Sequence, residues 1–174
     1  MELRRATPSD AEIMAKLHVD AWRAAYRGLV PDAFLDALEV DRWAERFQEW
    51  LSAQVEETYL AEQDGDLLGM LTIGACRDED IDQAITGEIW GIYLAPQYWR
   101  QGIGGALCRY GEGLLSRRGF QIATLWVFAG NERARRFYEA MGYTADGASQ
   151  VRDFGVPLEV VRYRKSLRNV ESQE

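Results

Sequence analysis

The segment from Thr86 to Phe128 limits the fold of this chain more than any other. Thr86–Leu94 is rich in β-branched and aromatic side chains, as buried strands are. Gly102–Arg118 then carries apolar residues at helical spacing, and Ile122–Phe128 predicts a further strand. Because a strand, a helix and a strand follow one another, we expect a parallel pair of strands within a mixed sheet.

The rest of the chain supplies elements on either side of this unit. Strands are expected at Glu2–Ala6, at Thr58–Glu62 and Leu67–Ala75 as a hairpin, and twice between Tyr143 and Ser166, the second around Val156–Arg164. Helices are expected at Ala11–Tyr26, from Pro31 to Leu38, at Asp41–Leu51, and from Asn131 to Met141. No repeat or linker interrupts the 174 residues, so we expect one domain over residues 1–168 and a frayed tail over 169–174.

Composition argues against several classes of protein. The formal net charge of −8 disfavours nucleic-acid binding, because Lys and Arg supply most of that affinity. No apolar run reaches the ~18–20 residues that a membrane helix needs, and the N-terminus lacks the apolar stretch of a signal peptide. Cys76 and Cys108 lie far apart in the sequence and His18 is the only His, so no metal site is expected. We therefore expect a cytoplasmic protein that binds no metal, nucleic acid or membrane.

The loop Trp99-Arg100-Gln101-Gly102-Ile103-Gly104-Gly105-Ala106 joins the strand to the helix. Its glycines let backbone N–H groups approach a ligand, and the helix N-terminus adds unpaired donors that suit a phosphate or pyrophosphate. A Walker A loop is excluded because the chain has no Gly-Lys, and a dinucleotide fingerprint lacks its third glycine at Leu107. Two interpretations stay open: a loop for the pyrophosphate of coenzyme A, and a helix start that uses glycines only for close packing.

Two motifs of this chain resemble those of the GNAT superfamily of acyl-CoA N-acyltransferases. The family pattern Gln/Arg-x-x-Gly-x-Gly/Ala is matched at Gly102 and Gly104, whereas Trp99 stands where the family usually has Gln or Arg. The family pattern Asn-x-x-Ala-x-x-Phe-Tyr-Glu-x-x-Gly-Phe/Tyr is matched by Asn131-Glu132-Arg133-Ala134-Arg135-Arg136-Phe137-Tyr138-Glu139-Ala140-Met141-Gly142-Tyr143. The segment from His18 to Leu38 also resembles one uncharacterised subgroup, which names no substrate.

The resemblance implies an α/β fold of the mixed α+β kind. It has a central, mostly antiparallel twisted sheet, a splayed parallel strand pair that binds coenzyme A, and helices on both faces. It also implies acetyl-CoA as the co-substrate, and a homodimer, because many relatives pair through a sheet edge or C-terminal strands. The residues expected to bind acetyl-CoA are Ile92, Tyr93, Leu94, Arg100, Gln101, Gly102, Ile103, Gly104, Gly105 and Asn131.

The function that the resemblance implies is direct transfer of an acetyl group from acetyl-CoA to a primary amine of a small molecule or peptide. Tyr138 matches the family Tyr near the CoA sulfur and is expected to act as general acid for the thiolate, with the Ile92 or Tyr93 N–H as oxyanion donor. Glu88 is expected as the base, often through water; the alternative is a surface Glu paired with an Arg. The alternative function is a non-catalytic acyl-CoA-binding or regulatory domain, and a binder of other phosphate ligands is disfavoured by the missing Lys.

His18, Trp22 and Tyr26 share one face of the first long helix, at positions i, i+4 and i+8. In this family the first helices border the acceptor site, so the three residues are expected to line the acceptor pocket, with His18 as an alternative base. A packing face is the other interpretation. The acidic loop Cys76–Ala84 predicts a solvated surface or, alternatively, attraction of a cationic amine. The identities of the amine and of the acyl group stay open.

Overall fold

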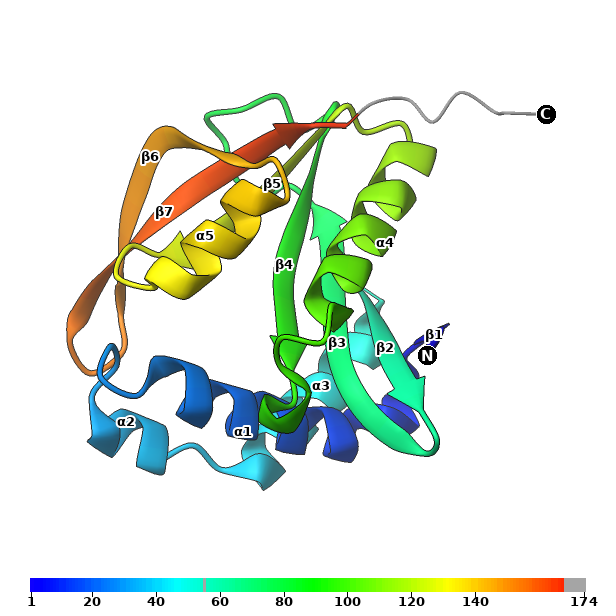
Figure 1. Ribbon diagram of the computed structural model, residues 1–174, viewed down its shortest axis with the longest axis vertical. Coiled ribbons are helices and arrows are strands. Elements are labelled where there is room, and N and C mark those ends of the chain that lie inside the picture. Colours follow the sequence, from blue (N-terminus) through cyan, green and yellow to red (C-terminus); the bar gives the residue numbers. More distant parts are fainter. Residues whose placement is uncertain (55, 168–174) are drawn as a thin grey trace.

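The computed structural model describes residues 1–54 and 56–167, and the predicted tail over 169–174 lies outside the described residues. Strands form one sheet in the order β1-β2-β3-β4-β5-β7-β6 (Figure 1). The strands are β1 (Glu2–Arg5), β2 (Glu57–Gln63), β3 (Asp66–Ala75), β4 (Thr86–Leu94), β5 (Ile122–Phe128), β6 (Thr144–Asp153) and β7 (Pro157–Ser166). The helices are α1 (Ala11–Tyr26), α2 (Asp32–Asp36), α3 (Val40–Ala53), α4 (Ile103–Arg117) and α5 (Glu132–Ala140).

The predicted parallel pair is β4 and β5, with α4 as their connection. All other neighbouring strands in the sheet are antiparallel. The observed bounds of α1, β4 and β5 equal the predicted ones, and the other elements differ by a few residues at their ends. Two short 3₁₀ turns, Pro8–Asp10 and Pro96–Tyr98, were not predicted, because a single turn leaves no apolar periodicity in the sequence.

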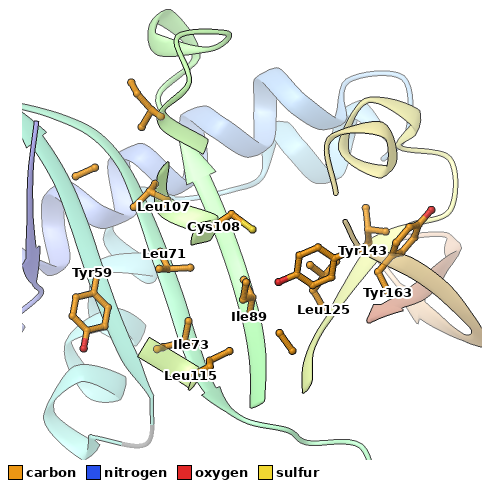
Figure 2. Packing of buried hydrophobic residues seen from close by; sticks show 14 of the residues in the cluster. Tyr59, Leu71, Ile73, Ile89, Leu107, Cys108, Leu115, Leu125, Tyr143 and Tyr163 are labelled. Carbon is orange, nitrogen blue, oxygen red and sulfur yellow. The ribbon is translucent and has the colours of Figure 1, made fainter. Parts of the chain in front are cut away.

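Helices cover both faces of the sheet, which confirms the predicted fold class. On one face, Leu107 and Cys108 of α4 pack with Leu71 of β3 and Ile89 of β4 (Figure 2). On the other face, α1 and α3 pack against Met70 of β3 and its neighbours in β2. Met70 and Leu71 are adjacent in sequence, so the alternation of a strand sends one to each layer of the core.

A third apolar cluster connects the C-terminal end of α1 with β5 and β7. Leu35 of α2 is buried together with Phe128 of β5 and Val160 of β7. Trp22 packs against this cluster, with its ring centre 5.7 Å from that of Phe154 in the β6–β7 turn. This contact fixes α1 beside the point where β4 and β5 separate. None of the helices within residues 1–54 and 56–167 is long and apolar enough to cross a membrane.

Candidate functional site

The parallel strands β4 and β5 diverge after a short paired stretch (Figure 1). The two strands pair only at Thr86–Glu88 and residues 122–124, whereas β4 stays paired with β3 as far as Leu94. In the described part of the chain, the β5-facing backbone groups of β4 beyond Glu88 therefore have no strand partner. A cavity of about 420 Å³ fills this space, with residues 90–94 of β4 on one wall and Trp126 and Val127 of β5 on the other. We call it the strand cleft.

The glycine loop and the start of α4 close one end of the strand cleft. Arg100, Gly102, Gly104 and Gly105 line it, as do the predicted strand residues 92–94. Gly102 precedes α4 with a φ of 82°, and a Cβ added there would meet no atom within 4 Å. The first N–H groups of α4 have no partner inside the helix, so this end of the cleft offers donors to an anion.

Two of the predicted loop residues lie outside the strand cleft. Gln101 and Ile103 line a different cavity beside the β2–β3 turn. The Gln101 side chain donates a 3.2 Å hydrogen bond to the carbonyl of Gln97, and Ile103 is buried in the core. In a helix start, neighbouring side chains point in different directions, so only some members of a contiguous motif can face the ligand.

An arginine that the loop motif does not contain also reaches the strand cleft. Arg133 of α5 lines the cleft, and its guanidinium carbon lies 4.0 Å from the ring centre of Trp99. The indole N–H of Trp99 donates a 3.1 Å hydrogen bond to the carbonyl of Leu94, which fixes the ring. Arg135 and Arg136 of the same helix bond to other side chains instead. Trp99 is uncharged, but its ring thus holds the Arg133 guanidinium beside the loop.

Helix α5 brings Asn131 and Tyr138 to the strand cleft. The side-chain oxygen of Asn131 accepts a 3.1 Å hydrogen bond from the N–H of Ala134, so Asn131 caps the helix. Burial raises the pKa of the Tyr138 hydroxyl well above its ordinary value, and nearby Cys108 and Tyr93 add to the rise. Tyr138 therefore keeps its proton at neutral pH and can donate it into the cleft.

A second cavity, of about 470 Å³, lies on the face of the sheet that α1 and α3 cover. We call it the aromatic cavity, because most of its large lining side chains are rings. His18 lies inside this set, with its ring centre 4.0 Å from that of Trp43 and 4.8 Å from that of Tyr93. The lining residues are His18, Trp22, Trp43, Phe47, Trp50, Glu56, Met70, Thr72, Arg77, Trp90, Gly91 and Tyr93.

The two cavities share one wall, made by Trp90, Gly91 and Tyr93 of β4. The Tyr93 ring folds back over Gly91, where an added Cβ would lie 2.7 Å from a ring carbon. A side chain at residue 91 would displace the ring, so this close approach requires glycine. The two cavities are therefore neighbours along this stretch of β4.

The chain was compared with known proteins, and the sequence model of the Acetyltransferase (GNAT) family matches residues 17–143. The chain belongs to the GNAT family. A similar curated relative is the uncharacterized N-acetyltransferase YuaI of Bacillus subtilis, 31% identical over 139 residues, or 79% of this chain and 77% of the relative. The probable N-acetyltransferase Rv2775 of Mycobacterium tuberculosis is 29% identical over 84% of this chain and 82% of its own length.

Solved GNAT structures confirm the fold. The PaiA N-acetyltransferase of Thermoplasma acidophilum, solved with coenzyme A, has a TM-score of 0.73 at 19% identity and covers 95% of this chain and 98% of its own. The structure of YncA of Salmonella typhimurium with its cofactor acetyl-CoA has a TM-score of 0.71 at 17% identity and covers 100% of this chain and 98% of its own. The GNAT fold, with its splayed parallel pair, is thus the fold of this chain.

The structure divides the three residues that were predicted to line a GNAT acceptor pocket. His18 and Trp22 line the aromatic cavity, whereas Tyr26 lines the strand cleft. Burial raises the pKa of Tyr26 well above its ordinary value, with smaller contributions from Tyr93 and Tyr138. Burial lowers the pKa of His18 to about 3, so its ring is neutral at neutral pH. Residues one or two turns apart on α1 therefore face different cavities.

Glu88 is buried, with 1% of its side chain exposed, and lines neither cavity. Arg77 donates three hydrogen bonds to its carboxylate, from the backbone N–H at 3.1 Å, from Nε at 3.2 Å and from Nη2 at 2.5 Å. The Arg77 guanidinium in turn lies 3.9 Å from the ring centre of Trp90. The structure places Glu88 behind Arg77 and the shared wall, and its role as a base stays a prediction.

Ion pairs with a buried arginine hold the acidic loop Cys76–Ala84 against the sheet. Arg162 of β7 pairs with Asp78 at 3.2 Å and with Asp80 at 2.7 Å, and also binds Asp146 of β6. Two of the carboxylates that were predicted to lie on a solvated surface are thus paired with Arg162. Among the described residues, no group of three or more His, Cys, Asp or Glu side chains could hold a metal ion.

Sequence reasoning missed Glu56, which lies between α3 and β2 and lines the aromatic cavity. It is 9% exposed and forms no hydrogen bond or ion pair with another described residue. Burial raises the pKa of Glu56, and the positive charge of Arg77 partly offsets the rise. A single Glu at the start of a strand belongs to no motif, so the sequence carries no signal for it.

Proposed function

We propose that this GNAT protein transfers an acetyl group from acetyl-CoA directly to a primary amine. Acetyl-CoA is proposed to enter the strand cleft and the amine the aromatic cavity. The observation that carries this proposal is the shared wall at Trp90, Gly91 and Tyr93, where the two cavities meet. Holding both substrates at one wall supplies the proximity that a two-substrate reaction needs.

The lining of the strand cleft suits coenzyme A in its charge and in its backbone hydrogen-bonding groups. The pyrophosphate is anionic, and the unpaired N–H groups at the start of α4 lie beside Arg100 and Arg133. The whole chain has a net charge of −8, so the positive charge of the two arginines at this end of the cleft is opposite in sign to that of the chain. The free edge of β4 offers backbone groups to the amide-rich pantetheine arm, with the Ile92 or Tyr93 N–H proposed to donate to the acetyl oxygen.

The chemistry breaks a thioester bond and forms an amide bond. The amine nitrogen attacks the acetyl carbon, the carbon–sulfur bond breaks, and Tyr138 donates its proton to the departing sulfur. The amine must lose a proton, for which Glu88, His18 and water are the candidates. Arg77 occupies the Glu88 carboxylate, and burial disfavours a charged His18 ring, so we propose that water molecules carry this proton to the bulk solvent.

The test is calorimetry with acetyl-CoA, followed by thiol release with a panel of primary amines. We expect saturable binding and thiol release with at least one amine. Binding without thiol release from any amine would favour the alternative, a non-catalytic acyl-CoA-binding domain. No heat and no thermal stabilisation at millimolar acetyl-CoA would contradict both.

We also propose that the protein forms a homodimer through the β6 edge of the sheet. Strand β6 pairs with β7 alone in the described part of the chain, and Val151 is 69% exposed on it. A sheet edge with an exposed apolar residue is a ready surface for a second copy. Light scattering checks the mass, and Val151→Lys is expected to yield monomer.

A further inference from the structure

The aromatic cavity has walls that select for a flat, apolar body. Its rings come from α1, α3 and β4, and most of them touch one another. A cavity of about 470 Å³ is of the size that holds small molecules. Large rings fixed by their neighbours bind other rings and cations through their faces.

Two groups of this cavity that can accept a hydrogen bond have no partner among residues 1–54 and 56–167, and the Trp22 indole N–H, a donor, lacks one as well. His18 is 4% exposed, and neither of its ring nitrogens has a hydrogen-bond partner in that part of the chain. Glu56 is likewise buried without a hydrogen bond or ion pair to a described residue. Since buried polar groups are rarely left unpaired, a ligand with polar hydrogens would complete both.

The charged residues that line the cavity leave a single negative charge. Arg77 and Glu88 form an ion pair, so their charges cancel. His18 is neutral at neutral pH, because burial holds its pKa at about 3. Glu56 is the one remaining acidic group among the described residues that line the cavity. The site is therefore matched to a ligand with one positive charge.

We propose that the aromatic cavity binds a primary monoamine with an aromatic body, and that Glu56 receives its ammonium group. The proposal rests on the proposed function, since it names the class of the acetyl acceptor. The rings of Trp43 and Trp50 hold the body of the amine, and its nitrogen lies between Glu56 and the shared wall at Tyr93. The charge of Glu56 acts on the Tyr93 hydroxyl, which places the two groups in one neighbourhood.

This charge pattern disfavours other classes of amine. A polyamine needs several carboxylates, and the described lining supplies one without a partner. An amino acid needs a free cation for its carboxylate, and Arg77 is already paired with Glu88. Arg152 of β6 carries charge near Tyr93 but lines neither cavity.

The experiment measures binding of 2-phenylethylamine to the full chain by calorimetry, without acetyl-CoA. Three competitors are compared: 2-phenylethanol, which lacks the charge; phenylalanine, which adds a carboxylate; and spermidine, which has several charges. We expect 2-phenylethylamine to bind at least tenfold more tightly than each. Glu56→Gln keeps the shape and removes the charge, and is expected to weaken amine binding about tenfold while leaving 2-phenylethanol unchanged. Glu49→Gln, at an exposed position of α3, is the matched control and is expected to bind as the wild type does.

Three results would overturn the proposal: no saturable binding of 2-phenylethylamine, equal or tighter binding of spermidine or phenylalanine, or unchanged amine binding in Glu56→Gln. The melting temperature of Glu56→Gln verifies that the variant is folded. Trp43→Leu is a second variant, which removes one ring from the wall of the aromatic cavity and leaves its charges unchanged. Binding of the amine that depends on Glu56, in a protein that fails to bind acetyl-CoA, would support this site and contradict the proposed function. The two failures are thus distinguishable.

Discussion

The two cavities that share a wall at β4 differ in the groups that they present to a ligand. The strand cleft presents main-chain groups of the free edge of β4, the glycine loop and the start of α4, beside side chains from α1, β5 and α5. The aromatic cavity is lined by large side chains from α1, α3, β3 and β4, and by Glu56 between α3 and β2. Main-chain N–H and C=O groups are present whatever the side chains are, so they suit a ligand that is shared by many enzymes, such as acetyl-CoA. Side chains can be exchanged one at a time, so they suit the substrate that distinguishes one enzyme from another.

The first prediction separates chemistry from binding in the strand cleft. Tyr138→Phe removes the proposed acid, and we expect turnover on an active amine to fall about 100-fold. Affinity for acetyl-CoA, measured by calorimetry, should change little, because the ring stays in place. Tyr110→Phe on α4, outside both cavities, is the matched control. Unaltered turnover in Tyr138→Phe would remove Tyr138 as the acid.

The second prediction concerns the arginine that Trp99 holds at the cleft. Arg133→Ala should weaken acetyl-CoA binding about tenfold, because the anionic end of the ligand loses a cation. Arg136→Ala removes a charge from the same helix, where Arg136 is exposed and paired with Glu132. If both variants weaken binding equally, the effect is one of general charge and not of a contact at Trp99.

The third prediction tests the backbone of the loop. Gly102 and Gly119 both have positive φ, of 82° and 90°, and open space where a Cβ would lie. Each Gly→Ala substitution should therefore lower the free energy of unfolding by about 1 kcal/mol, as measured by denaturant titration. Only Gly102→Ala should also weaken acetyl-CoA binding, by a few-fold, since Gly119 lies at the other end of α4. Equal affinities in the two variants would argue against a role of the loop in binding.

The fourth prediction concerns the aromatic cavity and has the smallest signal. His18 is the only His, so its ring resonances can be followed by NMR without ambiguity. With a folded pKa of about 3, the ring should not titrate between about pH 8 and about pH 5. The unfolded chain takes up this proton near the ordinary pKa of 6.5, so stability is complete above that pH and declines as the pH falls toward 3. A midpoint near pH 6.5 in the folded protein would show that the cavity is open to water at His18.

The sequence predicted the strand cleft far better than the aromatic cavity. Gly102 and Tyr138 belong to motifs of neighbouring residues in two consecutive strand–helix units, β4–α4 and β5–α5, so their shared location follows from the pairing of β4 with β5. Within those motifs, the direction of each side chain was harder to predict, and Gln101 and Ile103 point to another cavity. Arg133, Arg135 and Arg136 all lie in the second motif and could reach coenzyme A phosphates, but the sequence does not show that Arg133 is the one at the cleft, because its position depends on packing against Trp99.

The aromatic cavity depends on contacts between residues far apart in the sequence. Periodicity placed His18, Trp22 and Tyr26 on one helix face, but the splay of β4 from β5 decides which cavity each one meets. Glu56 and Glu88 are both isolated glutamates in the sequence. Only the fold shows that Glu88 is paired with Arg77 and that Glu56 faces the cavity without a hydrogen bond or ion pair to a described residue. Whether a single Glu forms an ion pair with an Arg elsewhere in the chain leaves no pattern in the sequence around that Glu.

The most direct test of the account is a crystal structure of the protein with coenzyme A. We predict the pyrophosphate at residues 100–105, the pantetheine arm along the free edge of β4, and the thiol beside Tyr138 at the wall formed by Trp90, Gly91 and Tyr93. The aromatic cavity should stay accessible from the other side of that wall. Coenzyme A bound elsewhere, or with its thiol away from this wall, would contradict the account.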